Sequence, residues 1–447
     1  MKKLLTVLGT LLVFVSSHAE VLEVIGIKTE TLYEGKTYEH VYIQGSKYIT
    51  LRNCTIKGAT QNYAAAIRVD GSSYITIENC DINGNAKACN GVNNHGSARL
   101  LVKNCRIYNC NDDGIEHHSG TLSDYVGNRI YNLRSCGTDN GCSSCNNGHS
   151  DGIELRRGTR INLIGNLLYG SMNTSCLFLG QVDPVTSDVV LHNNIMYGST
   201  CGYTAYIWYC HRLRAYNNVF WHAKYGAIWW GVNLTDAQFR NNILGGKWSF
   251  RSVSYNRNEH HVDNNLFTID FSHGNNNIRS SNPQFAGTPS NTSLNPTAFK
   301  LKSSSPCINK GMDDPGVPTT DHFGYERKGL PDIGVHEYGS TVGIDQGDPA
   351  GITNSELADV LTLQVYPLPM TGVGYFSMAR LEVTEPVLVT VFDQTGKTLR
   401  QLKSVPNSVI VSWDGKDKDG SQLKAGVYYY AVSAGPHYFT GRIVKTR

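Results

Sequence analysis

A two-residue marker recurs along most of the chain and constrains its fold more than any other feature. The marker is Asn followed by Cys or Asn, or Gly followed by Asn, with an apolar residue two positions later. Its second position falls at residues 54, 80, 105, 128, 166, 194, 218, 242 and 265, so successive copies are 26, 25, 23, 38, 28, 24, 24 and 23 residues apart. A period in the low twenties, with short alternating apolar runs and Asn/Gly turns, predicts a β-solenoid. Leucine-rich repeats share the period, but the sequence lacks their Leu-x-x-Leu-x-Leu frame.

The Asn and Cys residues of the marker have a predicted structural role, because repetition at one place in each coil is typical of scaffold residues. We expect each Asn side chain to point inward and to hydrogen-bond its equivalent one coil away, which also satisfies buried backbone groups. Cys54, Cys80 and Cys105 occupy the same place and are predicted to be small, buried free thiols. In the longest interval between markers, a disulfide fits better than a zinc site, since no second Cys pair accompanies the three cysteines there, Cys136, Cys142 and Cys145.

The repeat resembles the right-handed parallel β-helix of the pectin-lyase-like superfamily over roughly residues 35–340. The resemblance implies an all-β fold, a solenoid of about ten coils with short parallel strands and a narrow core of alternating Val, Ile and Leu. Segments 305–311 (Ser-Pro-Cys-Ile-Asn-Lys-Gly) and 331–339 (Pro-Asp-Ile-Gly-Val-His-Glu-Tyr-Gly) look like the closing tail of many secreted bacterial β-helix polysaccharide enzymes. We expect this tail to cover the open end of the solenoid. The superfamily includes glycoside hydrolases, polysaccharide lyases, uronate epimerases and phage adhesins, so the resemblance leaves the activity open.

Changes in composition divide the chain into four parts. Residues 1–19 have the basic start, apolar core and small-residue end of a secretory signal peptide, and the apolar run is too short to favour a transmembrane segment. Residues 20–340 hold the repeat and the expected catalytic domain, and residues 341–360 have the small, polar composition of a linker. Residues 361–447 resume the alternation, as in a small β-sandwich.

The C-terminal part also carries a resemblance. The phrases Trp-Asp-Gly-Lys-Asp-Lys-Asp-Gly at 413–420 and Ala-Gly-Val-Tyr-Tyr-Tyr at 425–430 resemble Ig-like C-terminal modules of exported bacterial proteins, flagellar hook-capping Ig domains and secretion-sorting tails. The resemblance implies a secreted protein, extracellular or at the cell surface, that contacts the secretion machinery. The net charge of +3 without a Lys/Arg stripe argues against nucleic acid as a partner. We expect the protein to be a monomer.

An acidic phrase occurs twice within the repeat, as Asp-Gly-Ile-Glu-His-His at 113–118 and Asp-Gly-Ile-Glu-Leu-Arg at 151–156. Each Ile precedes its marker Asn by 13 residues (128 − 115 and 166 − 153), so the two phrases are in register on successive coils. With both Ile side chains inward, Glu116 is predicted to lie above Glu154 on the outer face, about 4.8 Å away. Such a pair is destabilising unless one pKa is raised or a cation intervenes. The predicted catalytic residues are Glu116, Glu154, Asp113, Asp151 and His118.

Four residues of these phrases have an equally good or better structural explanation. Asp113 and Asp151 fit turn capping as well as catalysis, because Asp-Gly is a turn phrase in which Asp caps and Gly gives room. His118, predicted to lie above Arg156, is as well explained as a solvated surface histidine. His117 is expected to point inward and to be hydrogen-bonded in the core.

The same offset projects a stripe of cationic and aromatic residues along this outer face. Arg156 is placed to hold an anionic substituent with two hydrogen bonds. On later coils the stripe continues through Phe178, Tyr206 and Trp208 and then Trp229 and Trp230, for which the register is defined only to within one residue. Aromatic side chains there form a floor on which sugar rings stack. Residues 135–149 form an insertion beside the acidic pair, where binding sites are usually built. The predicted substrate-binding residues are Arg156, His149, Arg68, His95, Tyr206, Trp208, His211 and Trp230, with Trp229 beside them.

Three functions stay open on the sequence, all with an acidic (uronic or sulfated) polysaccharide as the partner. A glycoside hydrolase would use paired carboxylates and no cofactor. A polysaccharide lyase would bind Ca²⁺ on Asp113, Glu116, Asp151 and Glu154 and eliminate across the bond. The chondroitinase-B and alginate-lyase pattern, Arg-x-Gly followed one coil later by a catalytic Lys, is incomplete because residues 176–181 contain no Lys, and hydrolysis is therefore slightly favoured. A non-catalytic glycan-binding adhesin would need the aromatic residues but not the acids.

Overall fold

A computed structural model of the chain describes residues 20–58, 64–133, 149–170, 172–180, 186–199, 202–245, 248–250, 260–269, 274–289, 295–314, 316–340, 362–366, 370, 374–379, 387–404, 410–434 and 437–446. The expected signal peptide (1–19) and linker (341–360) lie outside these residues. So do Cys136, Cys142 and Cys145 and all of the expected insertion except His149.

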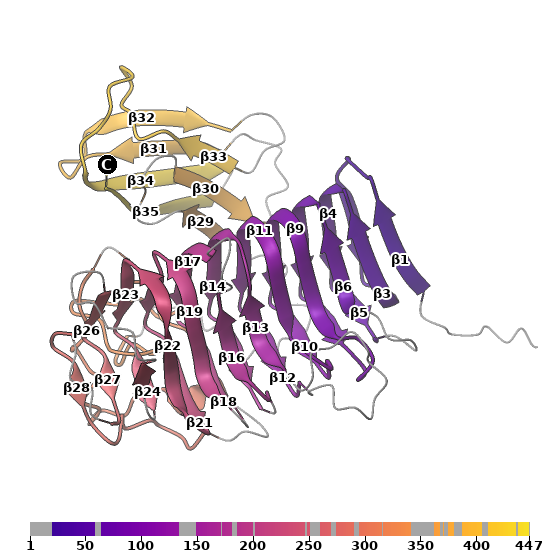
Figure 1. Cartoon of the computed structure of the whole chain (residues 1–447). Helices are drawn as coiled ribbons and strands as arrows, with labels where there is room; N and C mark the ends of the chain where they lie inside the picture. Colours follow the sequence, from indigo (N-terminus) through magenta and orange to yellow (C-terminus); the bar gives the residue numbers. More distant parts are fainter. Residues whose placement is uncertain are drawn as a thin grey trace, which may run out of the picture.

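The repeat forms a parallel β-helix with three sheets along its length (Figure 1). The first sheet contains β1 (Glu20–Ile25), β3 (Thr37–Gln44), β6 (Ala65–Asp70), the first halves of β9 (Asn90–Lys103) and β11 (Ile115–Val126), β13 (Asp151–Leu155), β16 (Ser175–Leu179), β19 (Tyr203–His211), β22 (Gly226–Thr235) and β25 (Trp248–Phe250).

The second sheet contains β2 (Thr31–Glu34), β4 (Lys47–Arg52), β7 (Ser73–Glu78), the second halves of β9 and β11, β14 (Thr159–Ile164), β17 (Thr186–His192), β20 (Arg214–Tyr216), β23 (Ala237–Arg240) and β26 (His260–Asp263). The third contains β5 (Thr55–Ile56), β8 (Asp81–Asn83), β10 (Arg106–Tyr108), β12 (Arg129–Tyr131), β15 (Leu167–Tyr169), β18 (Ile195–Ser199), β21 (Val219–Ala223), β24 (Ile243–Gly245), β27 (Leu266–Phe267) and β28 (Ile278–Arg279). About eight turns are complete, from β3–β5 to β22–β24, with partial turns at each end, slightly fewer than the ten coils expected.

The core follows from the alternation of side chains within each strand. In the first sheet, one inward position pairs from turn to turn and is apolar and fully buried throughout, at Val41, Ile67, Val92, Ile115, Ile153, Leu177, Ala205 and Ile228. Burying each larger side chain of this column stabilises the fold by about 1.5–3 kcal/mol before the entropy cost of ordering the chain. The position after it points outward, which puts one residue per turn in a line along the outer face.

The marker forms the predicted asparagine ladder. The Oδ1 atom of Asn166 accepts hydrogen bonds from both the backbone N–H and the side-chain amide of Asn128, each at 3.0 Å, and the same pair of bonds continues through Asn194, Asn218, Asn242, Asn265 and Asn277. The first residue of every marker has a positive φ, between 51° and 63°, which explains why only Asn or Gly occurs there. Cys54, Cys80 and Cys105 are buried free thiols, as predicted.

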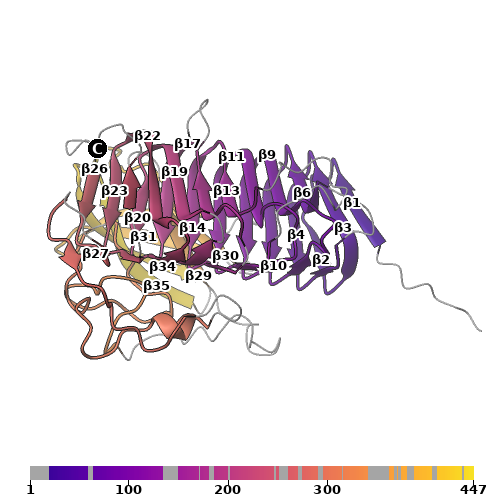
Figure 2. The same ribbon diagram turned by 60° about the horizontal axis from the view of Figure 1, so that its bottom comes forward.

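The segment that was expected to close the end of the solenoid covers a different surface. Rather than only covering the open end, residues 281–289, 295–314 and 316–340, which include η1 (Pro296–Phe299), pack along the side of several turns (Figure 2). Phe299, Cys307, Ile333 and Val335 form one apolar cluster with outward residues of the third sheet, and Asn217 donates to the carbonyls of residues 332 and 334. The reason is that the residues directly after the later marker asparagines, Leu167, Ile195, Val219, Ile243 and Leu266, are apolar and point outward, so this side of the solenoid needs a cover.

The C-terminal part forms two antiparallel sheets. One contains β29 (Thr362–Tyr366), β30 (Gly374–Ala379) and β33 (Ile410–Trp413), and the other β31 (Leu388–Phe392), β32 (Thr398–Lys403), β34 (Gly426–Ala434) and β35 (His437–Lys445). A shared core that includes Phe376, Val391 and Trp413 joins them as the expected small sandwich. Figure 1 places this module beside the solenoid, where Arg442 lies 3.5 Å from Asp313. No helix among the described residues is long and apolar enough to cross a membrane.

Candidate active site

The two acidic phrases lie on adjacent turns of the first sheet, in the predicted register. Ile115 pairs with Ile153, and Glu116 pairs with Glu154. The glycine of each phrase is required by the closeness of the next turn. A Cβ on Gly114 would lie 2.6 Å from the Gly152 carbonyl oxygen, and one on Gly152 would lie 2.4 Å from that of Cys176.

The two aspartates of the phrases have a structural role on one of their oxygens. Asp113 Oδ1 accepts the backbone N–H of Asp151 at 2.8 Å, and Asp151 Oδ1 accepts the hydroxyl of Ser175. The backbone N–H of Asp113 in turn donates to Asn90 Oδ1 at 3.1 Å. Asp113 is 1% exposed and Asp151 is fully buried, yet Asp113 Oδ2 accepts no hydrogen bond from the described residues, and Asp151 Oδ2 faces His149 Nε2 at 3.3 Å. One oxygen of each aspartate therefore belongs to the scaffold, and the other is available to the site.

Arg156 binds both stacked glutamates. Its Nε lies 2.8 Å from Glu154 Oε2 and 3.3 Å from Glu116 Oε1. Repulsion between the two carboxylates would otherwise be large at this burial, and the shared guanidinium, rather than the expected Ca²⁺, offsets it. The two acids are more enclosed than expected for the outer face, with Glu116 9% and Glu154 4% exposed, because the neighbouring turns and Arg156 cover them.

Two asparagines that sequence reasoning did not assign to the site hold Glu116 from the preceding turn. Asn90 Nδ2 donates to Glu116 Oε2 at 2.6 Å, and Asn93 Nδ2 donates to the same oxygen. The register was the available signal, since Asn93 pairs directly with Glu116. Burial raises the pKa of Glu116, and the donors Arg156 and Asn90 oppose that rise.

Asp112, also missed, joins the cluster beside Asp113. Burial, followed by the charge of Glu154, raises the pKa of Asp112 to about 8. Burial also raises the pKa of Asp113, and the charges of Asp112, Glu154 and Asp151 add to that rise. The pKa of Asp151 is raised well above its usual range, first by burial and then by Glu154. The cluster therefore keeps protons at neutral pH that isolated carboxylates would lose.

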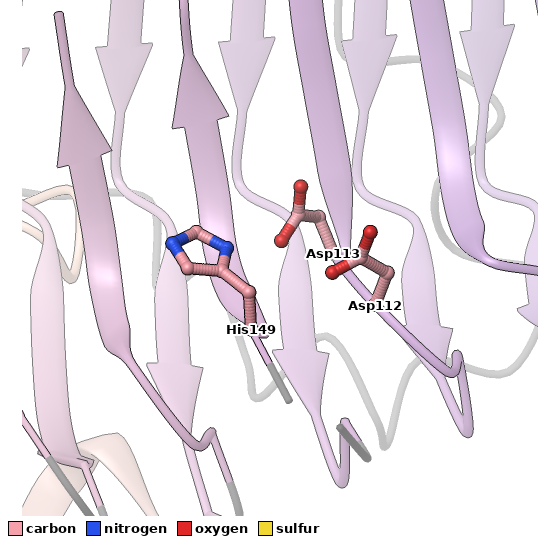
Figure 3. Close-up of side chains that lie close together, drawn as sticks. All are labelled: Asp112, Asp113 and His149. Atoms are coloured by element: carbon pink, nitrogen blue, oxygen red, sulfur yellow. The ribbon is translucent and has the colours of Figure 1, made fainter. Parts of the chain in front are cut away.

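His149 faces this cluster from the start of β13. Figure 3 shows its imidazole ring directed toward Asp113 and Asp112 from the adjacent turn. One ligand atom from each of Asp112, Asp113 and His149 lies within 4.8 Å of the others, and the same holds for His149, Asp151 and Glu154. His149 Nε2 lies 3.3 Å from Asp151 Oδ2, and burial lowers the pKa of this histidine.

The remaining predicted cations lie along the same face on the N-terminal side of the pair. His118 stacks on His95, with ring centroids 4.8 Å apart and planes 4° apart, and its Nδ1 lies 4.0 Å from Glu116 Oε1. Burial, followed by the neighbouring His95, lowers the pKa of His118. Arg68 pairs with Asp70 at 2.9 Å one turn further on. His117 points inward, where its Nδ1 hydrogen-bonds the Tyr125 hydroxyl at 2.8 Å, as predicted.

Aromatic side chains continue the stripe on the C-terminal side. Glu154 pairs with Phe178, Phe178 with Tyr206, and Tyr206 with Trp229, in the predicted order. The Phe178 and Tyr206 rings are 6.1 Å apart, and His149 meets the Phe178 ring edge-on at 5.7 Å. We call Phe178, Tyr206 and Trp229, which are all partly exposed, the aromatic floor.

Two predicted aromatic or imidazole ligands do not lie on this floor. The predicted role of Trp230 is wrong, because Trp230 is 1% exposed and packs in the core beside Phe239. Adjacent residues of a strand point to opposite sides, so only Trp229 of this pair points outward. His211 lies where β19 joins the second sheet and bonds Thr235. Trp208 is partly exposed and contacts the ring of Tyr209.

Comparison with known proteins agrees with the two-part architecture. Residues 23–147 match the family model "Right handed beta helix region", and residues 372–436 match the "FlgD Ig-like domain" model. The chain pairs a right-handed β-helix with an FlgD-type Ig-like module. No match was found among the curated proteins.

Several solved structures show weaker likeness. Pectate lyase Pel9A is 16% identical over 70% of this chain and 69% of its own, with a TM-score of 0.40. The tailspike gp49 of Acinetobacter baumannii bacteriophage Fri1, a capsular polysaccharide depolymerase, is 9% identical over 96% of this chain and 78% of its own, with a TM-score of 0.28. PorZ, a surface component of the type-IX secretion system of Porphyromonas gingivalis, is 26% identical over 19% of this chain and 11% of its own, with a TM-score of 0.16. At these TM-scores the likenesses carry no argument about activity.

Proposed function

We propose that this protein is a secreted enzyme that cleaves an acidic polysaccharide, and that it does so by hydrolysis at the Glu116–Glu154 pair. The observation that carries the proposal is the sharing of Arg156 by these two acids on one face, between a histidine pair and an aromatic floor. A purely structural scaffold gains nothing from two buried glutamates stacked at one strand spacing. A hydrolase needs two such groups on either side of the scissile bond.

The surroundings of the two glutamates favour different roles. Glu116 accepts hydrogen bonds from Asn90 and Asn93 and lies 3.3 Å from Arg156 Nε, and these contacts favour its carboxylate form, which suits a nucleophile or base. The charge of Glu154 helps to raise the pKa of neighbouring Asp113, so a proton is held next to Glu154 for transfer to the leaving oxygen. Glu154 would act as the general acid and would recover its proton from Asp113.

The spacing of the pair favours retention of anomeric configuration. The two glutamate oxygens lie 3.3 and 2.8 Å from the same nitrogen and are therefore no more than 6.1 Å apart. This is below the separation of roughly 6.5–9.5 Å that inverting enzymes need to seat a water molecule. Arg156 and the stacked His95 and His118 would hold anionic substituents of the glycan, and the floor would stack a neighbouring sugar ring.

Cation-assisted elimination is the second candidate, favoured by the convergence of His149 with Asp112 and Asp113. In that case a bound cation and Arg156 would neutralise the uronate carboxylate, which makes its α-proton easier to remove. A glycan-binding adhesin is the third, and it would use the floor without any role for the acids.

A digestion experiment separates the three. A panel of uronic and sulfated polysaccharides is incubated with the protein, and both new reducing ends and the ultraviolet absorbance of unsaturated uronates are followed. Reducing ends without absorbance support hydrolysis, both together support elimination, and binding without either supports an adhesin. Glu116→Gln and Glu154→Gln should each lower the rate at least a hundredfold. Asp236→Asn, which removes an exposed carboxylate paired with Arg214, is the control and should not change the rate. Full activity in both glutamine variants would show that this site is wrong.

A further inference from the structure

We propose that Asp112, Asp113 and His149 form a site for one divalent transition-metal ion, of the Zn²⁺ or Mn²⁺ class rather than Ca²⁺. The three side chains come from two adjacent turns and converge without contributing to the core (Figure 3). One ligand atom from each lies within 4.8 Å of the other two. The proposal extends the elimination candidate above, but metal binding can be measured without a glycan.

The buried aspartate oxygens are the observation that points to a ligand. Asp113 is 1% exposed, and its Oδ2 accepts no hydrogen bond from any described residue, while its Oδ1 is occupied by the backbone of Asp151. Asp112 Oδ1 is likewise buried without a donor. A buried polar atom left without a partner destabilises the fold, and more so when it carries charge. A cation between the two side chains would remove that cost at both atoms.

His149 decides between classes of cation. The span of 4.8 Å alone would suit Ca²⁺, whose ligands lie at about 2.3–2.6 Å, and would suit Zn²⁺ or Mn²⁺ after a closure of roughly half an ångström. Calcium, however, takes oxygen ligands, whereas an imidazole nitrogen with carboxylates is a donor set typical of first-row transition ions. The expected calcium site on the four acids therefore fits this donor set poorly, and Glu116 and Glu154 are already bound by Arg156.

The environment of His149 also suits a metal ligand. Its Nε2 lies 3.3 Å from Asp151 Oδ2, so the proton of the neutral ring belongs on that nitrogen and the Nδ1 lone pair is left for the ion. Asp151 would thus orient the ring as a supporting residue, in the carboxylate–histidine–metal arrangement common in metalloproteins. Figure 3 shows the ring turned toward Asp113, as this arrangement requires.

The test is calorimetric titration of the tag-free full chain, stripped with EDTA and dialysed, with Zn²⁺, Mn²⁺ and Ca²⁺ in turn. We expect one site that binds Zn²⁺ or Mn²⁺ at least tenfold more tightly than Ca²⁺. His149→Gln should weaken that binding at least thirtyfold, and Asp151→Asn should weaken it about tenfold, as expected for loss of a supporting residue. His261→Gln, which changes an exposed histidine of β26, is the matched control and should bind like the wild type.

Two further measurements distinguish loss of a metal ligand from unfolding of the variant. The His149 side chain is 30% exposed, so His149→Gln should keep the wild-type thermal unfolding midpoint. Co²⁺ gives an independent readout, since its visible absorption bands should change in His149→Gln and not in His261→Gln. Equal or tighter binding of Ca²⁺, or unchanged Zn²⁺ and Mn²⁺ binding in His149→Gln, would overturn the site. Polysaccharide cleavage by an EDTA-treated protein that binds no Zn²⁺ would reject this site and leave the proposed hydrolase intact.

Discussion

Glu116 and Glu154 lie on adjacent turns and are bound by the same nitrogen, Arg156 Nε, at 3.3 and 2.8 Å. All three side chains are at most 23% exposed. The guanidinium is therefore part of the fold as well as of the site, and its removal would leave two carboxylates facing each other with little water between them.

Arg156→Gln should destabilise the fold by about 3 kcal/mol, because breaking a buried ion pair leaves uncompensated charge. Adding Glu154→Gln to this variant should restore a large part of the loss, since a single carboxylate remains. Urea denaturation of the two single variants and the double variant at pH 7 measures this coupling. Additive effects in the double variant would mean that the three groups do not act as a unit.

The adjacent tryptophans of β22 should separate binding from stability. Trp229→Ala removes a wall of the aromatic floor and should weaken glycan binding roughly tenfold at unchanged stability. Trp230→Ala leaves a cavity in the core and should lower the free energy of unfolding by about 3–5 kcal/mol. Thermal unfolding and affinity electrophoresis on an acidic polysaccharide distinguish the two. Unchanged glycan binding in Trp229→Ala would show that the glycan does not bind at the aromatic floor.

Two glycines should respond oppositely to substitution. Gly165 has φ 63° with no atom within 4 Å of a built Cβ, and asparagines hold the same place in other turns, so Gly165→Asn should be neutral or stabilise by up to about 1 kcal/mol. Gly152→Ala should destabilise by about 1–3 kcal/mol, because its Cβ would lie 2.4 Å from a carbonyl oxygen. Denaturation midpoints check both, and tolerance of Gly152→Ala would contradict the packing of adjacent turns.

Burial of His117 should make the fold sensitive to acid. Burial lowers the pKa of His117 to about 4, from an ordinary value of 6.5. As the pH falls below 6.5 the unfolded chain takes up the proton first, so stability is lost between pH 6.5 and about 4, on the order of 3 kcal/mol. The raised pKa of Asp112 has the opposite effect, because it adds stability as the pH falls. Asp112 is present in the wild type and in a His117→Gln variant alike, so its effect cancels when the two are compared. His117→Gln should therefore lose less stability than the wild type between pH 7.5 and 4.5 in urea denaturation. An equal loss in both would assign the acid sensitivity to other groups.

The sequence predicted which residues of the site face each other on adjacent turns, but it did not predict the site's hydrogen bonds between those turns. The constant offset from Ile to the marker Asn placed Glu116 on Glu154 and ordered Phe178, Tyr206 and Trp229 correctly, because side chains alternate strictly within short strands. The same rule excludes Trp230 from the outer face, and the prediction failed there because the register had been left one residue uncertain. The register alone could have assigned Asn93 to the site, since it pairs with Glu116. Asn90 and Asp112 were missed because they lie at the bends where the strands begin, whose shape and side-chain rotamers no spacing reveals.

The even rise of the solenoid also sets a length scale for whatever lies on it. From Arg68 to Trp229 the outer line passes through Asn93, Glu116, Glu154, Phe178 and Tyr206, one residue per turn. At a rise of about 4.8 Å for each of six steps, the line is about 29 Å long. Along this line the cationic side chains lie at one end, the two glutamates lie in the middle and the aromatic side chains lie at the other end. Only an extended oligosaccharide could contact all three groups of side chains at once. The gain or loss of a single turn of the solenoid would therefore change the preferred length of the bound oligosaccharide in steps.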